Sequence, residues 1–194
     1  MTSPQPPSHE PAPGTRPRAA VVCESMFGNT AALGREIGSE LRDQGYDVDV
    51  WDVEQAPAPD SLDVDLLVVG APTHAFSLSR PGTRADAVRQ GADPARAHTG
   101  VREWLDVAEA PRHQPRLVCF DTRVTRVRHL PGSAARTAMR LGDKHHLGRR
   151  LAIESFYVED VGGPLLEGEL DRARELARDV GASVSRHGTT PERR

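Results

Sequence analysis

Residues 21–33 have the sequence VVCESMFGNTAAL and decide the fold of this chain. The apolar run at 19–23 predicts a buried strand, a short loop rich in hydroxyl, amide and glycine groups follows, and a helical pattern begins at Asn29. A turn from strand to helix collects unpaired backbone N–H groups and the positive end of the helix dipole at one place. The stretch therefore predicts a site for a phosphate group that needs no basic side chain.

All six residues of this first loop are candidate binding residues: Ser25, Met26, Phe27, Gly28, Asn29 and Thr30. Three of them add side-chain donors, and Gly28 lets the backbone approach an anion closely. The alternative is that Ser25 and Asn29 only cap the helix, although a cap requires just one such residue.

Other phosphate-handling motifs are excluded by their missing residues. The loop has neither the Gly-x-x-x-x-Gly-Lys-Ser/Thr pattern of nucleoside-triphosphate sites nor the Gly-x-Gly-x-x-Gly pattern of dinucleotide sites. A phosphatase with Cys23 as its nucleophile would need an arginine six positions later, where Asn29 stands. We therefore assign no catalytic residue, and the histidines lack the spacing of metal ligands.

The composition narrows the class of protein. The chain has 194 residues and a net charge of −3, which predicts one domain and gives no field that attracts nucleic acid or anionic lipid. No apolar run approaches the roughly 20 residues of a membrane span, and the N-terminus lacks the apolar core of a secretory signal. Both cysteines, Cys23 and Cys119, fall in predicted buried strands and suit a reduced, cytoplasmic protein.

Strands and helices alternate between two predicted disordered tails, residues 1–17 and 186–194. The five expected strands are residues 18–24, 46–53, 64–71, 116–121 and 151–158. The expected helices are residues 29–44, 83–90, 133–146 and 167–185, with one more beginning at Thr99 or Gly100. This order predicts a single α/β domain at 18–185, with a five-stranded parallel sheet covered by helices on both faces. Ligands of such sheets bind beyond the carboxyl ends of the strands.

Two further loops lie at that end of the predicted sheet. In the second loop, residues 70–77 (GAPTHAFS), Pro72 ends a strand, Thr73 offers a hydroxyl, and His74 and Phe76 offer planar groups for a planar ligand. For His74, a surface or capping role is equally consistent. In the third loop, residues 121–132 (DTRVTRVRHLPG), Asp121 and Thr122 are expected at a strand end, where they could hydrogen-bond the polar edge of a ring.

The motifs resemble those of the flavodoxin family over residues 18–185. SMFGNT at 25–30 is similar to the family's phosphate loop, Ser/Thr-x-Thr-Gly-x-Thr, and GAPTH at 70–74 is similar to the Gly-x-Pro-Thr segment of its second flavin loop. The resemblance implies a doubly wound sheet of order 2-1-3-4-5, non-covalently bound FMN and redox chemistry at the isoalloxazine ring. Arg123, Arg126 and Arg128 of the third loop are typical of a solvated surface, but one of them near the reducing end of a flavin would stabilise its anionic reduced form, and Arg123 is the first candidate.

The chain departs from the family at two places. Phe27 replaces the usual third-position hydroxyl, and the third loop has no tyrosine or tryptophan to stack on the ring. Either Phe76 or His129 takes that place, or the ring is more exposed and more loosely held. We expect electron transfer to a redox partner protein or reduction of a small acceptor. A cofactor-free binding module and an NAD(P)H-dependent quinone or FMN reductase are the alternatives, and the oligomeric state stays open.

Residues 77–99 form an unusually long connection for a compact domain. One interpretation is a lid whose Arg80, Arg84 and Arg89 meet an anionic substrate or a nicotinamide cofactor's phosphate. The other, which we favour slightly, is a surface helix or a dimer contact.

Overall fold

A computed structural model describes residues 16–187. The predicted tails therefore lie outside the described residues, apart from two positions at the inner end of each. The strands are β1 (Arg18–Cys23), β2 (Asp47–Asp52), β3 (Leu66–Pro72), β4 (Arg116–Val124) and β5 (Arg149–Val158). The helices are α1 (Asn29–Asp43), α2 (Pro81–Arg89), α3 (Val101–Asp106), α4 (Ala134–Lys144) and α5 (Glu169–His187).

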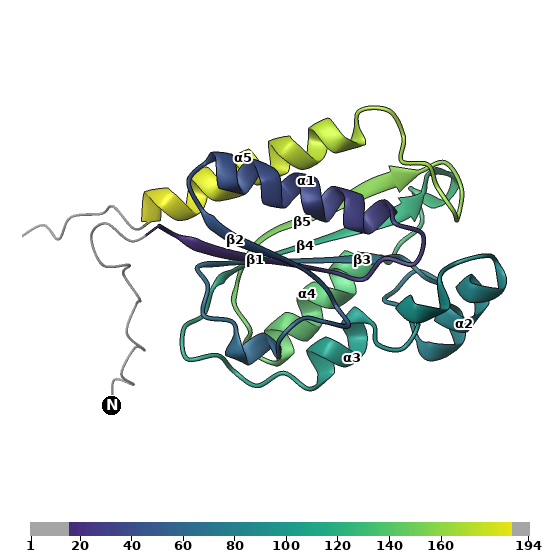
Figure 1. Cartoon of the computed structure of the whole chain (residues 1–194), viewed down its shortest axis with the longest axis horizontal. Helices are drawn as coiled ribbons and strands as arrows, with labels where there is room; N and C mark the ends of the chain where they lie inside the picture. Colours follow the sequence, from purple (N-terminus) through teal and green to yellow (C-terminus); the bar gives the residue numbers. More distant parts are fainter. Residues whose placement is uncertain (1–15, 188–194) are drawn as a thin grey trace, which may run out of the picture.

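The five strands form one parallel sheet of order β2-β1-β3-β4-β5, which confirms the predicted fold class and strand order. Helices α1 and α5 cover one face of the sheet, and α3 and α4 cover the other (Figure 1). Helix α2 lies beyond the end toward which the strands point, so residues 77–99 reach the predicted ligand-binding edge (Figure 1).

The central strands bury both of their faces. Along β1, Ala20 and Val22 enter the core under α3 and α4, while Ala19 and Val21 enter the core under α1 and α5. This alternation explains why β1 and β3 are apolar runs without the polar positions of a half-exposed strand. The burial of both faces fixes the end of β1, and with it the place where the first loop begins.

The core is tight where β3 passes β4. A Cβ added to Gly70 would lie 2.2 Å from the ring of Phe120, which itself packs edge-to-face on Phe156 with ring centroids 5.8 Å apart. We expect Gly70→Ala to lower the free energy of unfolding by about 1–3 kcal/mol through overpacking, measured by urea denaturation. Gly82→Ala in α2, where nothing lies within 4 Å of the added carbon, should change it by less than about 1 kcal/mol. Equal effects of the two substitutions would contradict this account of the core.

Strand β4 is longer than predicted. Its pairing with β5 continues to Val124 opposite Val158, so residues 122–124 are strand and not loop. The polar sequence after Phe120 indicates a loop, but the neighbouring strand supplies backbone partners that no local pattern reveals. In the described part of the chain, no helix combines the length and apolar character needed to cross a membrane.

Candidate functional site

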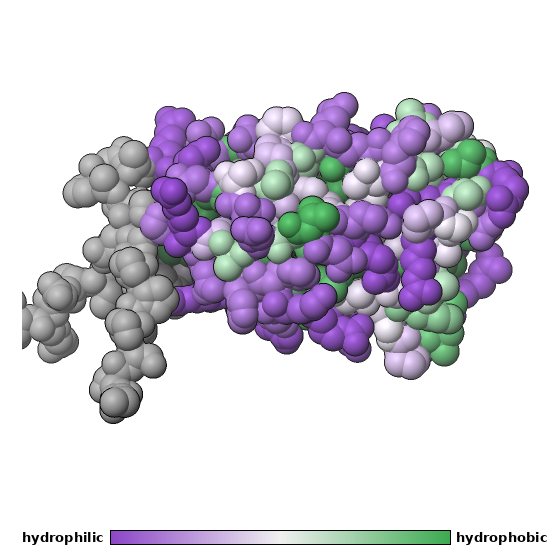
Figure 2. Space-filling model, turned by 90° about the horizontal axis from the view of Figure 1, so that it is seen from below, coloured by the Kyte–Doolittle hydropathy of each residue, from purple (hydrophilic) through white to green (hydrophobic). Residues whose placement is uncertain are grey.

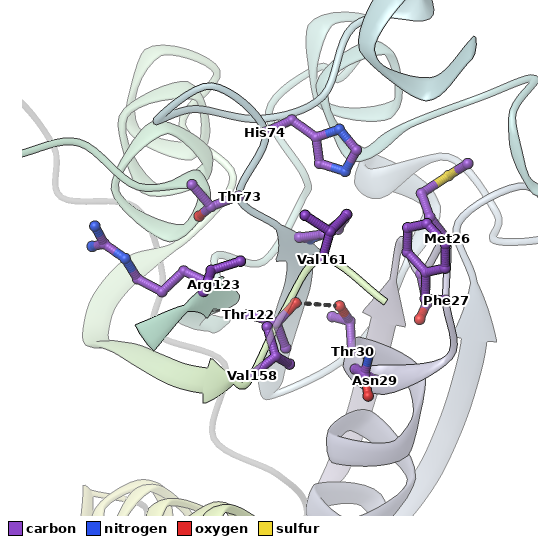
Figure 3. Close-up of a pocket in the computed structure, with 13 residues that line it drawn as sticks. Met26, Phe27, Asn29, Thr30, Thr73, His74, Thr122, Arg123, Val158 and Val161 are labelled. Carbon is purple, nitrogen blue, oxygen red and sulfur yellow. Dashed lines mark hydrogen bonds between the residues drawn. The ribbon is translucent and has the colours of Figure 1, made fainter. Parts of the chain in front are cut away.

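The carboxyl ends of β1, β3, β4 and β5 surround a small hollow of about 70 Å³ (Figure 3). Its lining residues are Ser25, Met26, Phe27, Asn29, Thr30, Pro72, Thr73, His74, Thr122, Arg123, Val124, Val158 and Val161. Sites that enclose a whole small molecule typically measure about 300–1,000 Å³. The hollow can therefore enclose only the phosphate-sized end of a larger ligand.

The structure brings ten of the thirteen predicted site residues to this hollow. Gly28, Phe76 and Asp121 do not line it. Three valines, Val124, Val158 and Val161, line it without having been predicted. All three lie at or just beyond the carboxyl ends of β4 and β5, where ligands of parallel sheets bind. Their apolar side chains carry no donor, acceptor or charge by which the sequence could have identified them.

The backbone of the first loop presents unpaired donors. Gly28 has φ +90°, and nothing lies within 4 Å of a carbon added there. Its carbonyl accepts the first helical bond, from Ala32 N–H at 2.9 Å. Within the described part of the chain, the N–H groups of residues 26–30 donate to no protein acceptor. Five such donors lie at the N-terminus of the 15-residue helix α1, a position at which proteins commonly bind anions.

The polar side chains of this loop hold its shape. Ser25 Oγ accepts a hydrogen bond from Ala31 N–H at 3.1 Å, and Asn29 Nδ2 donates to the carbonyl of Gly162 at 3.2 Å. The hydroxyls of Thr30 and Thr122 are hydrogen-bonded at 2.8 Å and buried (Figure 3). The loop is thereby tied to β4 and to the connection between β5 and α5, and the backbone N–H groups remain its main free donors.

The connection at 77–99 packs against the first loop. Met26 is buried among Ala87, Ala92 and neighbouring side chains, and Arg96 Nη1 donates to the carbonyl of Ser25 at 3.2 Å. Phe27 is half-buried in the same group and lines the hollow without filling it. The segment therefore supports the loop from the side.

A buried polar cluster fixes this support. Arg84 is fully buried, and its Nη1 donates to Ser79 Oγ at 2.9 Å and to Glu103 Oε2 at 3.1 Å. Glu24, also buried, accepts from Val101 N–H at 2.9 Å through Oε2. Arg84 thus faces the interior, so the interpretation that it meets an anionic substrate is wrong. Arg89, the other helical arginine of that interpretation, is paired with Asp86.

Burial raises the pKa of Glu24, an effect that Ser79, Val101 and Arg84 only partly oppose. The folded protein therefore holds this proton more tightly than the unfolded chain, and its stability falls as pH rises from the ordinary glutamate pKa through the raised one. Glu24→Gln keeps an acceptor for Val101 and removes the titration, so its free energy of unfolding should fall less over this range. Urea denaturation at a series of pH values measures the difference. Glu159→Gln, at an exposed position, should retain the wild-type slope; a wild-type slope in the Glu24 variant would contradict the assignment.

The second loop ends in a tight two-residue turn. His74 and Ser77 exchange backbone hydrogen bonds at 2.9 and 3.0 Å, and Ala75 and Phe76 between them have φ values of 46° and 65°. Residues other than glycine rarely adopt this left-handed backbone conformation, which costs of order 1–3 kcal/mol per residue and often marks a functional site. The turn leaves the Phe76 side chain 47% exposed. Burial lowers the pKa of His74, which keeps its ring neutral near pH 7.

Predicted contacts in the second and third loops turn out to organise α4. Thr73 Oγ1 accepts from Ala134 N–H at 2.9 Å, and Asp121 Oδ2 accepts from Ala135 N–H at 3.0 Å. Asp121 is fully buried within β4 and does not stand at a strand end. Its carboxylate satisfies an orphan donor of the helix, which is a structural task.

The guanidinium of Arg123 lies away from the hollow, which only the stem of this side chain lines (Figure 3). Its Nη2 donates to the carbonyls of Val127 at 2.6 Å and Leu130 at 3.1 Å. Arg123 therefore holds the third loop in place. This position differs from the expected one beside a reduced ring.

Comparison with known proteins supports the fold. No family model matches the chain, and no curated protein matches its sequence. A flavodoxin from Streptococcus pneumonia TIGR4 has a TM-score of 0.59 at 20% identity, covering 86% of this chain and 99% of that one. A flavodoxin from the domain Archaea has a TM-score of 0.57 at 14% identity, with 87% and 99% covered. Oxidised flavodoxin 1 from Bacillus cereus has a TM-score of 0.53 at 14% identity, with 88% and 98% covered.

These matches extend over nearly the full length of each flavodoxin and agree with the strand order observed here. At 14–20% identity they establish architecture and do not transfer a ligand or an activity. The protein has the flavodoxin-like fold.

Proposed function

We propose that this protein binds FMN and uses it to transfer electrons to a partner protein or a small acceptor. The observation that carries the proposal is the first loop, whose five N–H groups at 26–30 have no acceptor among residues 16–187 and lie at the N-terminus of α1. An ester phosphate supplies the charge and the acceptor oxygens that this cradle of N–H groups lacks.

Two groups of residues would hold the two ends of FMN, its phosphate and its ring. The N–H groups of residues 26–30 would hold the phosphate, and the strand-end loops that carry His74 and Phe76 would contact the ring. When bound, FMN supplies the acceptance and release of one or two electrons. The neutral His74 places no positive charge near the ring, and the guanidinium of Arg123 is turned toward the third loop, so electrostatic stabilisation of a reduced ring would come from backbone N–H groups.

A cofactor-free binding module is the second candidate. It is favoured by the small volume of the hollow and by the internal hydrogen bonds of Asn29 and Thr30, which occupy side chains expected to serve the phosphate. A flavin-dependent NAD(P)H oxidoreductase is the third, and its distinguishing property is catalytic turnover.

The test is reconstitution followed by reduction. Protein purified with added FMN should retain the visible flavin spectrum after gel filtration, and stepwise anaerobic reduction should bleach it in proportion to the electrons added. Protein that emerges colourless would contradict the proposal and support the cofactor-free module. Rapid NAD(P)H oxidation on adding a quinone would identify the oxidoreductase.

A further inference from the structure

Two arginines converge on a pair of hydroxyl groups beside the second loop. Ser77 Oγ and Thr137 Oγ1 are hydrogen-bonded at 3.2 Å. Arg102 Nη2, from α3, donates to Ser77 Oγ at 3.1 Å, and Arg140 Nη2, from α4, donates to Thr137 Oγ1 at 3.2 Å. A chain of three hydrogen bonds thus links the guanidinium of Arg102 on α3 to that of Arg140 on α4 through the hydroxyls of Ser77 and Thr137. We call Ser77, Arg102, Thr137 and Arg140 the arginine–hydroxyl cluster.

The direction of the hydrogen bonds in this cluster is fixed. Thr137 Oγ1 donates to the carbonyl of Ser133 at 3.1 Å, so the Ser77 hydroxyl must donate to Thr137. Both hydroxyl oxygens therefore accept from guanidinium groups. Arg102 also donates to the carbonyls of Ser79 and Leu78, each at 3.1 Å, which anchors its side chain. The Nη1 groups of Arg102 and Arg140 have no acceptor in the described part of the chain.

The cluster carries positive charge without a counter-ion. Within residues 16–187 no carboxylate oxygen lies within 4.0 Å of Arg102 or Arg140. On the adjoining helix α3, Glu103 is paired with Arg84, and the exposed Asp106 forms no ion pair. Residues 122–142 contain five arginines and no carboxylate, whereas the whole chain has a net charge of −3. Two like charges held together in this way repel each other, and a bound anion would relieve the repulsion.

The cluster is accessible and adjoins the candidate site. Ser77, Arg102 and Thr137 are half-buried and Arg140 is exposed, on the molecular face formed by α3 and α4. That face is largely hydrophilic, and its hydrophobic residues gather toward the end occupied by the strand-end loops (Figure 2). Ser77 also closes the turn with His74, which lines the hollow.

We propose that the arginine–hydroxyl cluster binds a phosphate or carboxylate group of the molecule that exchanges electrons with the protein. The Nη1 group of each guanidinium can donate a charge-assisted hydrogen bond to an oxygen of either anion, so the two arginines together would hold it from two sides. The role in substrate recognition rests on the proposed function; the binding of an anion does not. The substrate class is therefore anionic.

The first experiment uses the cofactor-free protein and inorganic phosphate. In ¹H–¹⁵N NMR titrations, the amides of residues 76–79 and 136–140 should shift and saturate, separately from those of the first loop at 26–30. Arg140→Gln should weaken this binding at least about fivefold, in line with the loss of a charge-assisted contact. Arg149→Gln removes the same charge from an exposed position at the opposite end of the sheet and should leave it unchanged. Repeating the titration with acetate distinguishes a phosphate site from a carboxylate site.

The second experiment uses the FMN-loaded protein and two small oxidants of opposite charge. Arg140→Gln should slow reoxidation of the reduced protein by ferricyanide roughly threefold or more and should not slow reoxidation by hexaammineruthenium(III). Absent shifts at the cluster, or equal effects of Arg140→Gln and Arg149→Gln in the titration, would overturn the anion site. A cluster that binds phosphate in a protein unable to bind FMN would overturn only the proposed function, and equal slowing with both oxidants would overturn the role in substrate recognition.

Discussion

Asn29→Asp is expected to weaken FMN binding by about 100-fold while leaving riboflavin binding unchanged. The substitution is nearly isosteric and places a carboxylate at the first residue of α1, beside the backbone donors of the phosphate cradle. Two unit charges a few ångströms apart at an effective dielectric of about 20 repel by roughly 3 kcal/mol, and riboflavin has no phosphate to be repelled. The fold should survive, because a negative charge at a helix N-terminus is stabilising. Flavin fluorescence titration measures both affinities.

The matched control separates charge from the lost hydrogen bond. Asn29→Ala also removes the bond to the Gly162 carbonyl but adds no charge, so FMN affinity should fall only a few-fold. Equal losses in the two variants would mean that the Asn29 amide, and not the electrostatics of the cradle, controls binding. Equal losses for FMN and riboflavin would contradict the placement of the phosphate.

Arg84→Ala is expected to lower the free energy of unfolding by about 3 kcal/mol or more. The substitution removes the cation of this cluster, so Ser79 Oγ and the Ala97 carbonyl lose the Arg84 donor and Glu103 Oε2 keeps its hydrogen bond from Gly100 N–H. Removing a large, fully buried side chain typically costs about 2–5 kcal/mol, and the Glu103 side chain, which is 37% exposed, adds little because water solvates it. Because the segment at 77–99 supports the first loop through Met26, FMN affinity should fall as well. Urea denaturation and flavin titration measure the two effects.

Arg89→Ala is the control within the same helix. Arg89 pairs with Asp86 on the surface, with both side chains more than half exposed, and exposed pairs contribute roughly 0–1 kcal/mol. A similar loss of stability in both variants would show that the burial of Arg84 is not what stabilises the segment.

The sequence predicts the framework of this protein well because that framework depends on local patterns. The apolar run of β1, the glycine at position 28 and the helical pattern from Asn29 are sufficient to place the first loop, and alternation of strands and helices is sufficient for the sheet. These local patterns were also sufficient to predict ten of the residues that line the hollow.

The sequence is less informative where partners come from distant segments. Asp121 suggests a ligand contact until α4 is seen to donate Ala135 N–H to it, and Arg84 suggests a surface cation until Glu103, Ser79 and Ala97 are found around it. A buried arginine and an exposed one look alike in a sequence. Their roles depend on long-range packing, which only the structure displays.

The most direct test of the central claim is the comparison of FMN and riboflavin binding to the wild-type protein. If the backbone donors of residues 26–30 bind the ester phosphate, FMN should bind at least about 100-fold more tightly than riboflavin, a difference of roughly 3 kcal/mol. Equal affinities, or no binding of either flavin, would contradict the account.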